Sequence, residues 1–284
     1  MRVAITGGSG FIGSVAIHAI ARAGHSVTAL VRPESRRDHI EASVDRFVVG
    51  EHDDESAWPQ LLEGAEVVVH SSVDWPALHS GDEHRHLRSN LLGSIRLLHA
   101  SRPLPFVYLS SIAVHHDMRP RWEGRVDEDH PLRPSSAYGA LKAALESHLW
   151  AEHFGQGRAT TALRPCAVYG IDPTLERSHG YEIIRMLRAR KPFQRSGGGK
   201  FVHVDDVAAA IVACLGNPLA AGRPFNLVDC YARWSDLAQM AAEELAVDAS
   251  IDHSSPPEPR NMFTKDAAAS LGVRLDRGHA GIRT

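Results

Sequence analysis

The pair Tyr138 and Lys142 carries the clearest chemistry in this sequence, because a phenol and an ammonium lie four residues apart. In a helix, residues at this spacing occupy the same face, one turn apart. The positive charge favours the phenolate, so the pKa of Tyr138 is expected to fall toward neutral pH. Such a phenol can move a proton to or from a carbonyl or alkoxide oxygen. Alone, the spacing also fits two solvated residues on a helix surface.

A glycine-rich turn near the start of the chain supplies a second signal. The apolar run 1–6 is typical of a buried strand, and Gly7, Gly10 and Gly13 separate it from a helical pattern. Glycine permits a tight turn and a close approach of backbone to a pyrophosphate, and the helix N-terminus offers unpaired N–H groups. The spacing is Gly-x-x-Gly-x-x-Gly rather than Gly-x-Gly-x-x-Gly. Its position between strand and helix nevertheless predicts a dinucleotide site.

Strand and helix patterns alternate through the first two thirds of the chain. This alternation predicts a doubly wound α/β fold of the Rossmann type, with a parallel sheet and helices on both faces. Ligands bind at the carboxyl ends of such strands, where Gly7, Ser71, Ser111 and Pro165 are expected. The strands are predicted at 1–6, 26–31, 46–49, 66–70, 106–110 and 160–164, and one helix is expected to hold Leu87, Asn90, Leu91, Ile95 and Leu98.

The pattern changes near residue 171. We predict a Rossmann domain over 1–170, to which about 200–230 also contribute, and a small, discontinuous C-terminal substrate-binding lobe over 171–284. In this lobe we expect helices at 176–189 and starting near 205 and 235, strands at 201–204 and 224–228, and a flexible glycine stretch at 196–199.

The composition is that of an ordinary globular protein. The chain has 284 residues, 43% of them hydrophobic, and a formal net charge of −3, which points to neither nucleic acid nor an anionic membrane. No apolar run reaches the ~20 residues that span a bilayer, and the predicted cofactor strand leaves no room for a signal peptide, so a cytoplasmic protein is expected. The three cysteines and 18 histidines lack metal-site spacing, and no metal is predicted.

Together with four other segments, the two motifs described above follow one another in a specific order: 6–13, 110–114, 138–142, 163–170, 201–208 and 225–227. Together they resemble the extended short-chain dehydrogenase/reductase family in its NAD(P)-dependent epimerase/dehydratase branch. The resemblance implies that Ser111 bonds the substrate oxygen, that Tyr138 is the general acid/base, and that Lys142 binds the nicotinamide ribose and lowers the tyrosine pKa. It also implies that Asn90 helps to position the lysine through water, although bonding within its own helix is an alternative.

The resemblance also implies the cofactor contacts. The expected set, besides Tyr138 and Lys142, is Gly7, Ser9, Gly10, Phe11, Ile12, Gly13, Arg32, Glu51, His52, Ser71 and Pro165. Arg32 closes the second strand, Arg36 and Arg37 follow, and no carboxylate stands at the strand tip. Because arginine suits a 2′-phosphate whereas an acidic residue would bond a free 2′-hydroxyl, NADP is favoured and NAD remains possible.

Departures from the nucleotide-sugar members of the family favour a smaller substrate. Pro165, Cys166 and Ala167 occupy the stretch where those members usually place an asparagine, and the chain is short for that group. We therefore expect an NADP-dependent reductase or dehydrogenase acting on a carbonyl or secondary alcohol of a small molecule. A nucleotide-sugar epimerase or dehydratase, with a transiently reduced cofactor, is the alternative, and a non-catalytic NADP-binding module is a third interpretation.

Two further expectations concern the surroundings of the site. Trp75, His115 and His116 are candidates for lining the substrate pocket, although surface or packing roles fit them equally. The resemblance suggests a homodimer through the helices that bear Asn90 and Tyr138. The apolar residues that would form this contact, or else cover the sheet, are Leu87, Leu91, Leu145 and Leu149.

Overall fold

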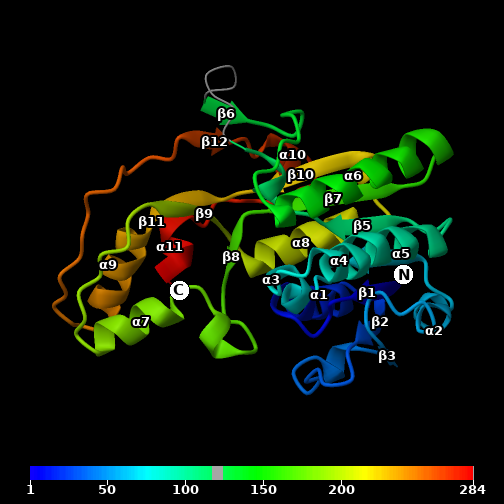
Figure 1. Ribbon diagram of the computed structural model, residues 1–284, viewed down its shortest axis with the longest axis horizontal. Coiled ribbons are helices and arrows are strands. Elements are labelled where there is room, and N and C mark those ends of the chain that lie inside the picture. The colour runs from blue at the N-terminus through cyan, green and yellow to red at the C-terminus, as the bar shows by residue number, and fades with distance from the viewer. Residues whose placement is uncertain (117–123, 284) are drawn as a thin grey trace.

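The computed structural model describes residues 1–116 and 124–283. Its centre is a seven-stranded parallel sheet in the order β3-β2-β1-β4-β5-β7-β10 (Figure 1). Chain order reverses between β1 and β4. The crevice at the carboxyl ends of these two strands is therefore the topological switch point of the sheet. The predicted Rossmann-type fold is thus confirmed. The strands are β1 (Arg2–Thr6), β2 (Ser26–Val31), β3 (Arg46–Val49), β4 (Val67–His70), β5 (Phe106–Leu109), β7 (Thr160–Pro165) and β10 (Arg223–Leu227).

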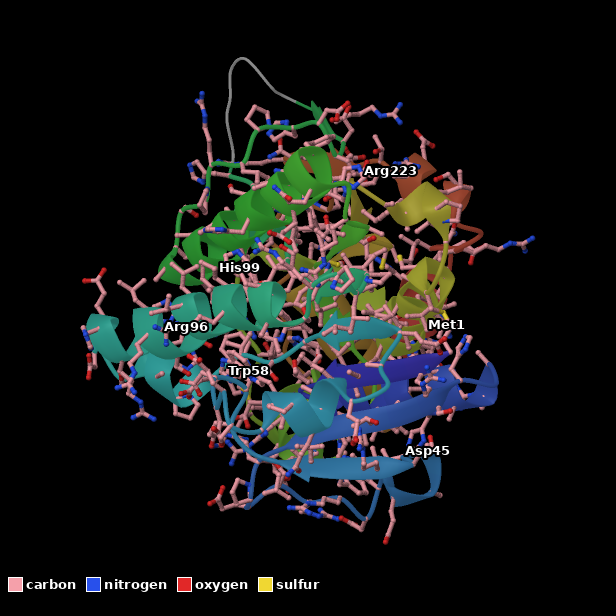
Figure 2. The ribbon with its side chains drawn as sticks, turned by 90° about the vertical axis from the view of Figure 1, so that its right-hand side faces the viewer. Met1, Asp45, Trp58, Arg96, His99 and Arg223 are labelled. Carbon is pink, nitrogen blue, oxygen red and sulfur yellow. The ribbon has the colours of Figure 1, made fainter. Side chains whose placement is uncertain are left out.

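Alternating residues of these strands enter two separate cores, one on each face of the sheet. In β1, Val3 and Ile5 belong to one core and Ala4 to the other, as the two-residue period of a strand requires. Helices α1 (Phe11–Arg22) and α8 (Val204–Cys214) cover the first face. The second face is covered by α2 (Trp58–Leu62), α5 (Ser94–Ala100) and α6 (Ala137–Gln156), and Figure 2 labels Trp58, Arg96 and His99 on this side.

The leucines considered for a dimer contact lie in different surroundings. Leu145 and Leu149 are fully buried in the second core, so they cover the sheet of their own chain and are not available to a partner. Leu87 is 43% exposed. Of the two expected roles, covering the sheet is the one that the leucines of α6 have.

The connection between β4 and β5 differs from the single helix that the sequence predicts. It consists of α3 (Trp75–His79), α4 (Glu83–His86), a π-helical segment η2 (Leu87–Gly93) and then α5. Within it, the Ser94 hydroxyl donates to the Asn90 carbonyl at 2.6 Å. π-Helical segments are rare in proteins, and many of those that occur lie at functional sites.

A smaller unit follows β7 and occupies the left of Figure 1. Its sheet has the order β11-β9-β8, and a third apolar core joins it to its helices. Two expectations are corrected here. Gly198 and Gly199 belong to strand β9, and a Cβ on Gly198 would lie 2.5 Å from the Ala232 carbonyl oxygen, so close strand pairing explains that glycine. The helix predicted over 176–189 is a 3-10 turn, η4 (Leu175–Arg177), followed by a shorter helix, α7 (Tyr181–Arg188).

The remaining elements complete this unit and the edge of the molecule. They are β8 (Ala167–Tyr169), β9 (Gly198–His203), β11 (Cys230–Arg233), α9 (Trp234–Glu244), α11 (Gly278–Arg283), the paired strands β6 (Gly124–Val126) and β12 (Asn261–Phe263), α10 (Asp266–Ser270), and the 3-10 turns η1 (Glu41–Ser43), η3 (Ile112–Val114) and η5 (Pro218–Ala220). Over the described residues, no helix combines the length and the apolar character that crossing a membrane requires.

Candidate active site

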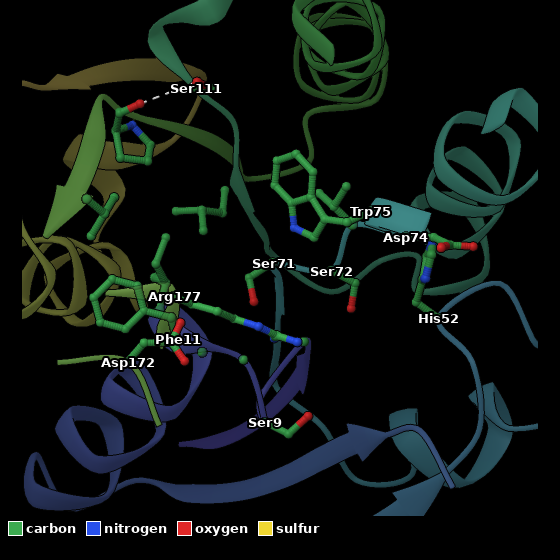
Figure 3. Close-up of a pocket in the computed structure, with 18 of the residues that line it drawn as sticks. Ser9, Phe11, His52, Ser71, Ser72, Asp74, Trp75, Ser111, Asp172 and Arg177 are labelled. Carbon is green, nitrogen blue, oxygen red and sulfur yellow. Dashed lines mark hydrogen bonds between the residues drawn. The ribbon is translucent and has the colours of Figure 1, made fainter. Parts of the chain in front are cut away.

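A cavity of about 1360 Å³ runs along the carboxyl ends of the sheet strands. Single small-molecule pockets usually measure ~300–1,000 Å³, so this volume can hold a dinucleotide together with a small substrate. Every residue predicted to bind cofactor lines it, and so does Ser111. Asn90 lies outside the lining. Figure 3 shows the cavity between the glycine turn, the loop after β4 and the loop after β5.

The glycine turn has the geometry that a diphosphate site requires. Gly7 has a φ of 73°, and a Cβ there would lie 2.7 Å from Ser71 Oγ. A Cβ on Gly13 would lie 2.1 Å from the Gly7 carbonyl oxygen, so only glycine allows α1 to begin this close to β1. Helix α1 has no side-chain cap and no acidic residue in its first turn. Its first N–H groups are therefore suited to an anion.

Ser111, Tyr138 and Lys142 meet at the other end of the cavity. Ser111 Oγ donates to the Pro165 carbonyl oxygen at 3.4 Å, as the dashed line in Figure 3 marks, and it is near enough to the phenol of Tyr138 to act on its pKa. The buried Lys142 Nζ donates to the Leu109 carbonyl oxygen at 2.6 Å and lies 5.6 Å from the centre of the Tyr138 ring. The three side chains come from the loop after β5 and from α6, whose N-cap is Ser136.

Burial dominates the electrostatics of this group. It lowers the pKa of Lys142 to about 7, against the opposing charge of Glu146. It also raises the pKa of Tyr138 above its ordinary value, while the hydrogen bond with Ser111 acts in the opposite direction. The expected fall in the tyrosine pKa is therefore not found here, because desolvation of the phenolate outweighs the groups that stabilise it.

Trp75 covers the phenol ring of Tyr138. The two rings are stacked, with centres 5.2 Å apart and planes inclined by 26°, and the indole is 47% exposed. Trp75 lines the cavity, as Figure 3 also shows, and so does His115. His116 is exposed and is not part of the lining.

Asn90 fixes the loop that carries Trp75. Its Oδ1 accepts from the Asp74 backbone N–H at 2.7 Å, and its Nδ2 donates to the Asp74 carbonyl at 3.0 Å and to His86 Nδ1 at 3.1 Å. The amide is buried and engaged with these groups rather than with Lys142. Only the bond to His86 is local, as the alternative expected, and the two bonds to Asp74 reach outside the helical segment. Their consequence was not indicated by the sequence, because Asp74 directly precedes the tryptophan that stacks on Tyr138.

The buried His70 links the end of β1 to Ser94, at the start of α5. His70 lies 2.7 Å from Thr6 Oγ1 through Nδ1 and 2.9 Å from Ser94 Oγ through Nε2. Because Ser94 donates its proton to the Asn90 carbonyl, Nε2 of His70 is the donor and Nδ1 accepts from Thr6. Full burial holds the pKa of His70 well below its usual value. This neutral chain of hydrogen bonds connects the end of β1 with the segment around Asn90.

Charged side chains of both signs line the far end of the cavity, at the tip of β2. Arg32, Glu34 and Arg36 are among them, and Arg36 is paired with Asp38 at 2.7 Å. The neighbouring Arg37 turns away and places its guanidinium 5.8 Å from the centre of the Phe47 ring. Glu51 and His52 also line this end. Burial raises the pKa of Glu51, and the charge of Arg32 opposes that rise.

A buried ion pair lies behind the end of the cavity that holds Ser111, Tyr138 and Lys142. The Arg164 guanidinium and the Glu146 carboxylate are 2% and 0% exposed and form a contact of 2.6 Å. Ser110 donates to the same carboxylate, and Arg164 lies 3.4 Å from His115 Nε2. Burial and the charge of Arg164 lower the pKa of His115 to about 4, so its ring faces the cavity in the neutral form near pH 7.

The smaller unit contributes cavity residues that the sequence did not single out. Asp172, Arg177 and His179 line the cavity from the loop between β8 and α7. The sequence predicted a single helix over 176–189, and such a helix gave no indication that Arg177 would line the cavity. Within residues 1–116 and 124–283, no three or more His, Cys, Asp or Glu side chains form a group that could hold a metal ion.

Comparisons with known proteins agree with this architecture. The ketoreductase of 4-hydroxy-2-methyl-3-oxo-4-farnesyl-3,4-dihydroquinoline-1-oxide from Stigmatella aurantiaca is 33% identical over 78% of this chain. The dTDP-glucose 4,6-dehydratase of Mycobacterium tuberculosis is 29% identical over 74% of it. The matched segments span 65% and 67% of the length of these two relatives.

A solved structure shows the same fold over the whole chain. The UDP-glucose 4-epimerase of Thermus thermophilus, crystallised with NAD, superposes with a TM-score of 0.79 at 22% identity and covers 100% of this chain and 97% of its own. The sequence also matches the family described as NAD dependent epimerase/dehydratase over residues 3–227. This match extends from β1 to the end of β10 and includes the glycine turn, Tyr138 and Lys142, so the chain belongs to the NAD dependent epimerase/dehydratase family.

Proposed function

We propose that this protein is an NADP-dependent reductase or dehydrogenase of a carbonyl or secondary alcohol on a small organic substrate. The observation that carries the proposal is the single cavity that joins the glycine turn to Ser111, Tyr138 and Lys142. A dinucleotide that places its diphosphate at the turn would bring its other end toward this group. Residues 1–170, with part of 200–230, would hold the cofactor, and 171–284 would mainly cover the substrate.

Each residue of this group has a defined task in the proposed reaction. The bound nicotinamide supplies or accepts the hydride at the substrate carbon. Ser111 Oγ donates a hydrogen bond to the substrate oxygen, and Tyr138 gives that oxygen its proton in reduction or removes it in oxidation. Lys142 Nζ bonds the hydroxyls of the nicotinamide ribose. Because the amine is already fixed on the Leu109 carbonyl, it is held in place for this contact.

The burial of Tyr138 suits a proton donor. A phenol whose pKa is raised stays protonated near neutral pH, which is the state that reduction of a ketone requires. Trp75 limits the access of water to one face of the ring. Both features suit Tyr138 to give a proton to a substrate oxygen, and the oxidation is the reverse of the same step.

The proposed preference for NADP rests on Arg32. Its side chain lines the cavity at the tip of β2, next to the expected position of the adenine ribose. A hydrogen bond between charged partners contributes ~1.5–3 kcal/mol, which corresponds to a preference of about ten- to a hundredfold. Glu34 and Glu51 line the same end and would repel a 2′-phosphate, so the lower part of this range is expected.

Equilibrium titration with NADPH and NADH tests the cofactor assignment. Wild-type protein should bind NADPH more tightly, and Arg32→Ala should abolish the difference. Arg37→Ala is the matched control, because that side chain packs on Phe47 instead of lining the cavity. A preference of the wild type for NADH, or an unchanged ratio in Arg32→Ala, would contradict the assignment.

A nucleotide-sugar epimerase or dehydratase is the second candidate, supported by the match to a dTDP-glucose dehydratase. The two candidates differ in the fate of the cofactor. A panel of ketones and sugar nucleotides, followed at the nicotinamide absorbance, should show net oxidation of NADPH with a ketone. Turnover of a sugar nucleotide without net change of cofactor would favour the second candidate. Tight NADPH binding without any turnover would favour a non-catalytic binding module.

A further inference from the structure

Arg177 is a cation that enters the cofactor cavity from the smaller unit. It ends the 3-10 turn η4, its side chain lines the cavity, and it is solvent-exposed. In the view of Figure 3 this side chain extends across the cavity, and its guanidinium projects between Ser71 and Ser9. Both of these serines also line the cavity.

The position of Ser71 defines what faces this guanidinium. Ser71 Oγ donates to the Thr6 carbonyl at 2.8 Å and would lie 2.7 Å from a Cβ on Gly7. Ser9 belongs to the same turn and precedes Gly10, the N-cap of α1. The guanidinium therefore shares one cavity with the glycine turn and the beginning of α1. The Arg177 guanidinium and the uncapped N–H groups of α1 both favour a negatively charged group in the space that they line.

The loop that carries Arg177 starts from the same place. Gly170 lies close to the beginnings of α8 and α1, because a Cβ there would be 2.7 Å from the Val204 side chain and 3.4 Å from the Phe11 ring. Asp172 follows, and its carboxylate accepts from the Thr174 backbone N–H at 2.7 Å, while the Asp172 N–H donates to Ser178 Oγ at 2.9 Å. These bonds fold the loop back on itself over the cavity. The loop that carries Arg177 thus leaves the smaller unit near the start of α1 and lines the same cavity as the glycine turn.

We propose that Arg177 binds the diphosphate of the cofactor from the side opposite the glycine turn. This role rests on the proposed cofactor function and extends it, because it makes the smaller unit a participant in cofactor binding as well as in substrate binding. Arginine matches two phosphate oxygens with parallel N–H groups, and the contact would be formed with NADP and NAD alike, since both contain the diphosphate.

Equilibrium binding without substrate separates this role from others. Arg177→Ala should weaken NADPH and NADH by the same factor, about ten- to a hundredfold, and Arg177→Lys should recover part of the loss. Adenosine 2′-phosphate, which lacks the diphosphate, should bind wild type and Arg177→Ala equally in a competition assay. Arg188→Ala is the control, because that exposed arginine ends α7 outside the cavity lining.

The outcomes are distinguishable from failure of the proposed function. If wild type binds neither dinucleotide, the proposed function fails and the role of Arg177 fails with it. If wild type binds NADPH and Arg177→Ala binds it equally well, the role of Arg177 alone is refuted. An equal loss for adenosine 2′-phosphate would also refute it, since the defect would then lie at the adenosine end or in the fold. A change confined to the substrate KM would assign Arg177 to the substrate instead.

Discussion

The buried amine of Lys142 makes the stability of the protein depend on pH in a way that can be measured without knowing the substrate. Its pKa is about 7 in the folded chain, against 10.5 for an ordinary lysine, because burial disfavours the charged form. Between these two values the unfolded chain holds a proton that the folded chain has released. The free energy of unfolding therefore rises with pH in this window. From pH 7 to pH 9 the integrated contribution is about 2 kcal/mol.

Urea unfolding at pH 7, 8 and 9 gives the assay, with Lys142→Met as the comparison. Methionine has a similar length and no proton to release, so its stability lacks this contribution. The stability of wild type minus that of the variant should increase by about 2 kcal/mol between pH 7 and pH 9. Tyr138 and Cys166, whose raised pKa values lower the stability above pH 9, are present in both proteins, so their contributions cancel in this difference. Parallel pH profiles would refute the reasoning, since Lys142 would then titrate alike in both states.

Two further predictions concern the same end of the cavity. Tyr138→Phe should lower kcat by about 10²–10⁴-fold, because general acid–base help is lost, while the Kd for NADPH stays within a factor of a few; undiminished turnover would exclude Tyr138 as the proton donor. Glu146→Gln should lower the free energy of unfolding by about 3–5 kcal/mol in urea, because it leaves the buried Arg164 without its charge partner. The double variant Glu146→Leu/Arg164→Met should be clearly more stable than Glu146→Gln, and equal instability would argue against the unpaired charge as the cause.

Much of the fold follows from sequence periodicity, and the reason is local. Strands β2 and β3 begin and end at the predicted residues, because runs of apolar residues bounded by polar ones are readable without knowledge of their neighbours. The π-helical segment around Asn90 could not be predicted in this way. Its form depends on hydrogen bonds to Asp74, which lies 16 residues earlier and belongs to another element.

The site shows the same division between what is local and what is not. The lining of the cavity by Tyr138, Lys142 and the glycine turn was predictable, since each lies on an element with a clear pattern. The stacking of Trp75 on Tyr138 was not, because the two residues are brought together by tertiary packing alone. Arg177 was missed for a related reason: the polar segment before α7 resembles a continuous helix until the 3-10 turn is seen.

The positions of the functional side chains depend on carbonyl groups at the ends of three strands. Lys142 donates to Leu109, the last residue of β5; Ser111 donates to Pro165, the last residue of β7; and Ser71 donates to Thr6, the last residue of β1. Carbonyl groups at the carboxyl end of a parallel strand become free where pairing stops, and buried ones need a donor. In this chain the donors are residues that line the cavity. The sheet therefore orients the site directly through its backbone, which explains how polar groups from separate crossovers converge at the switch point.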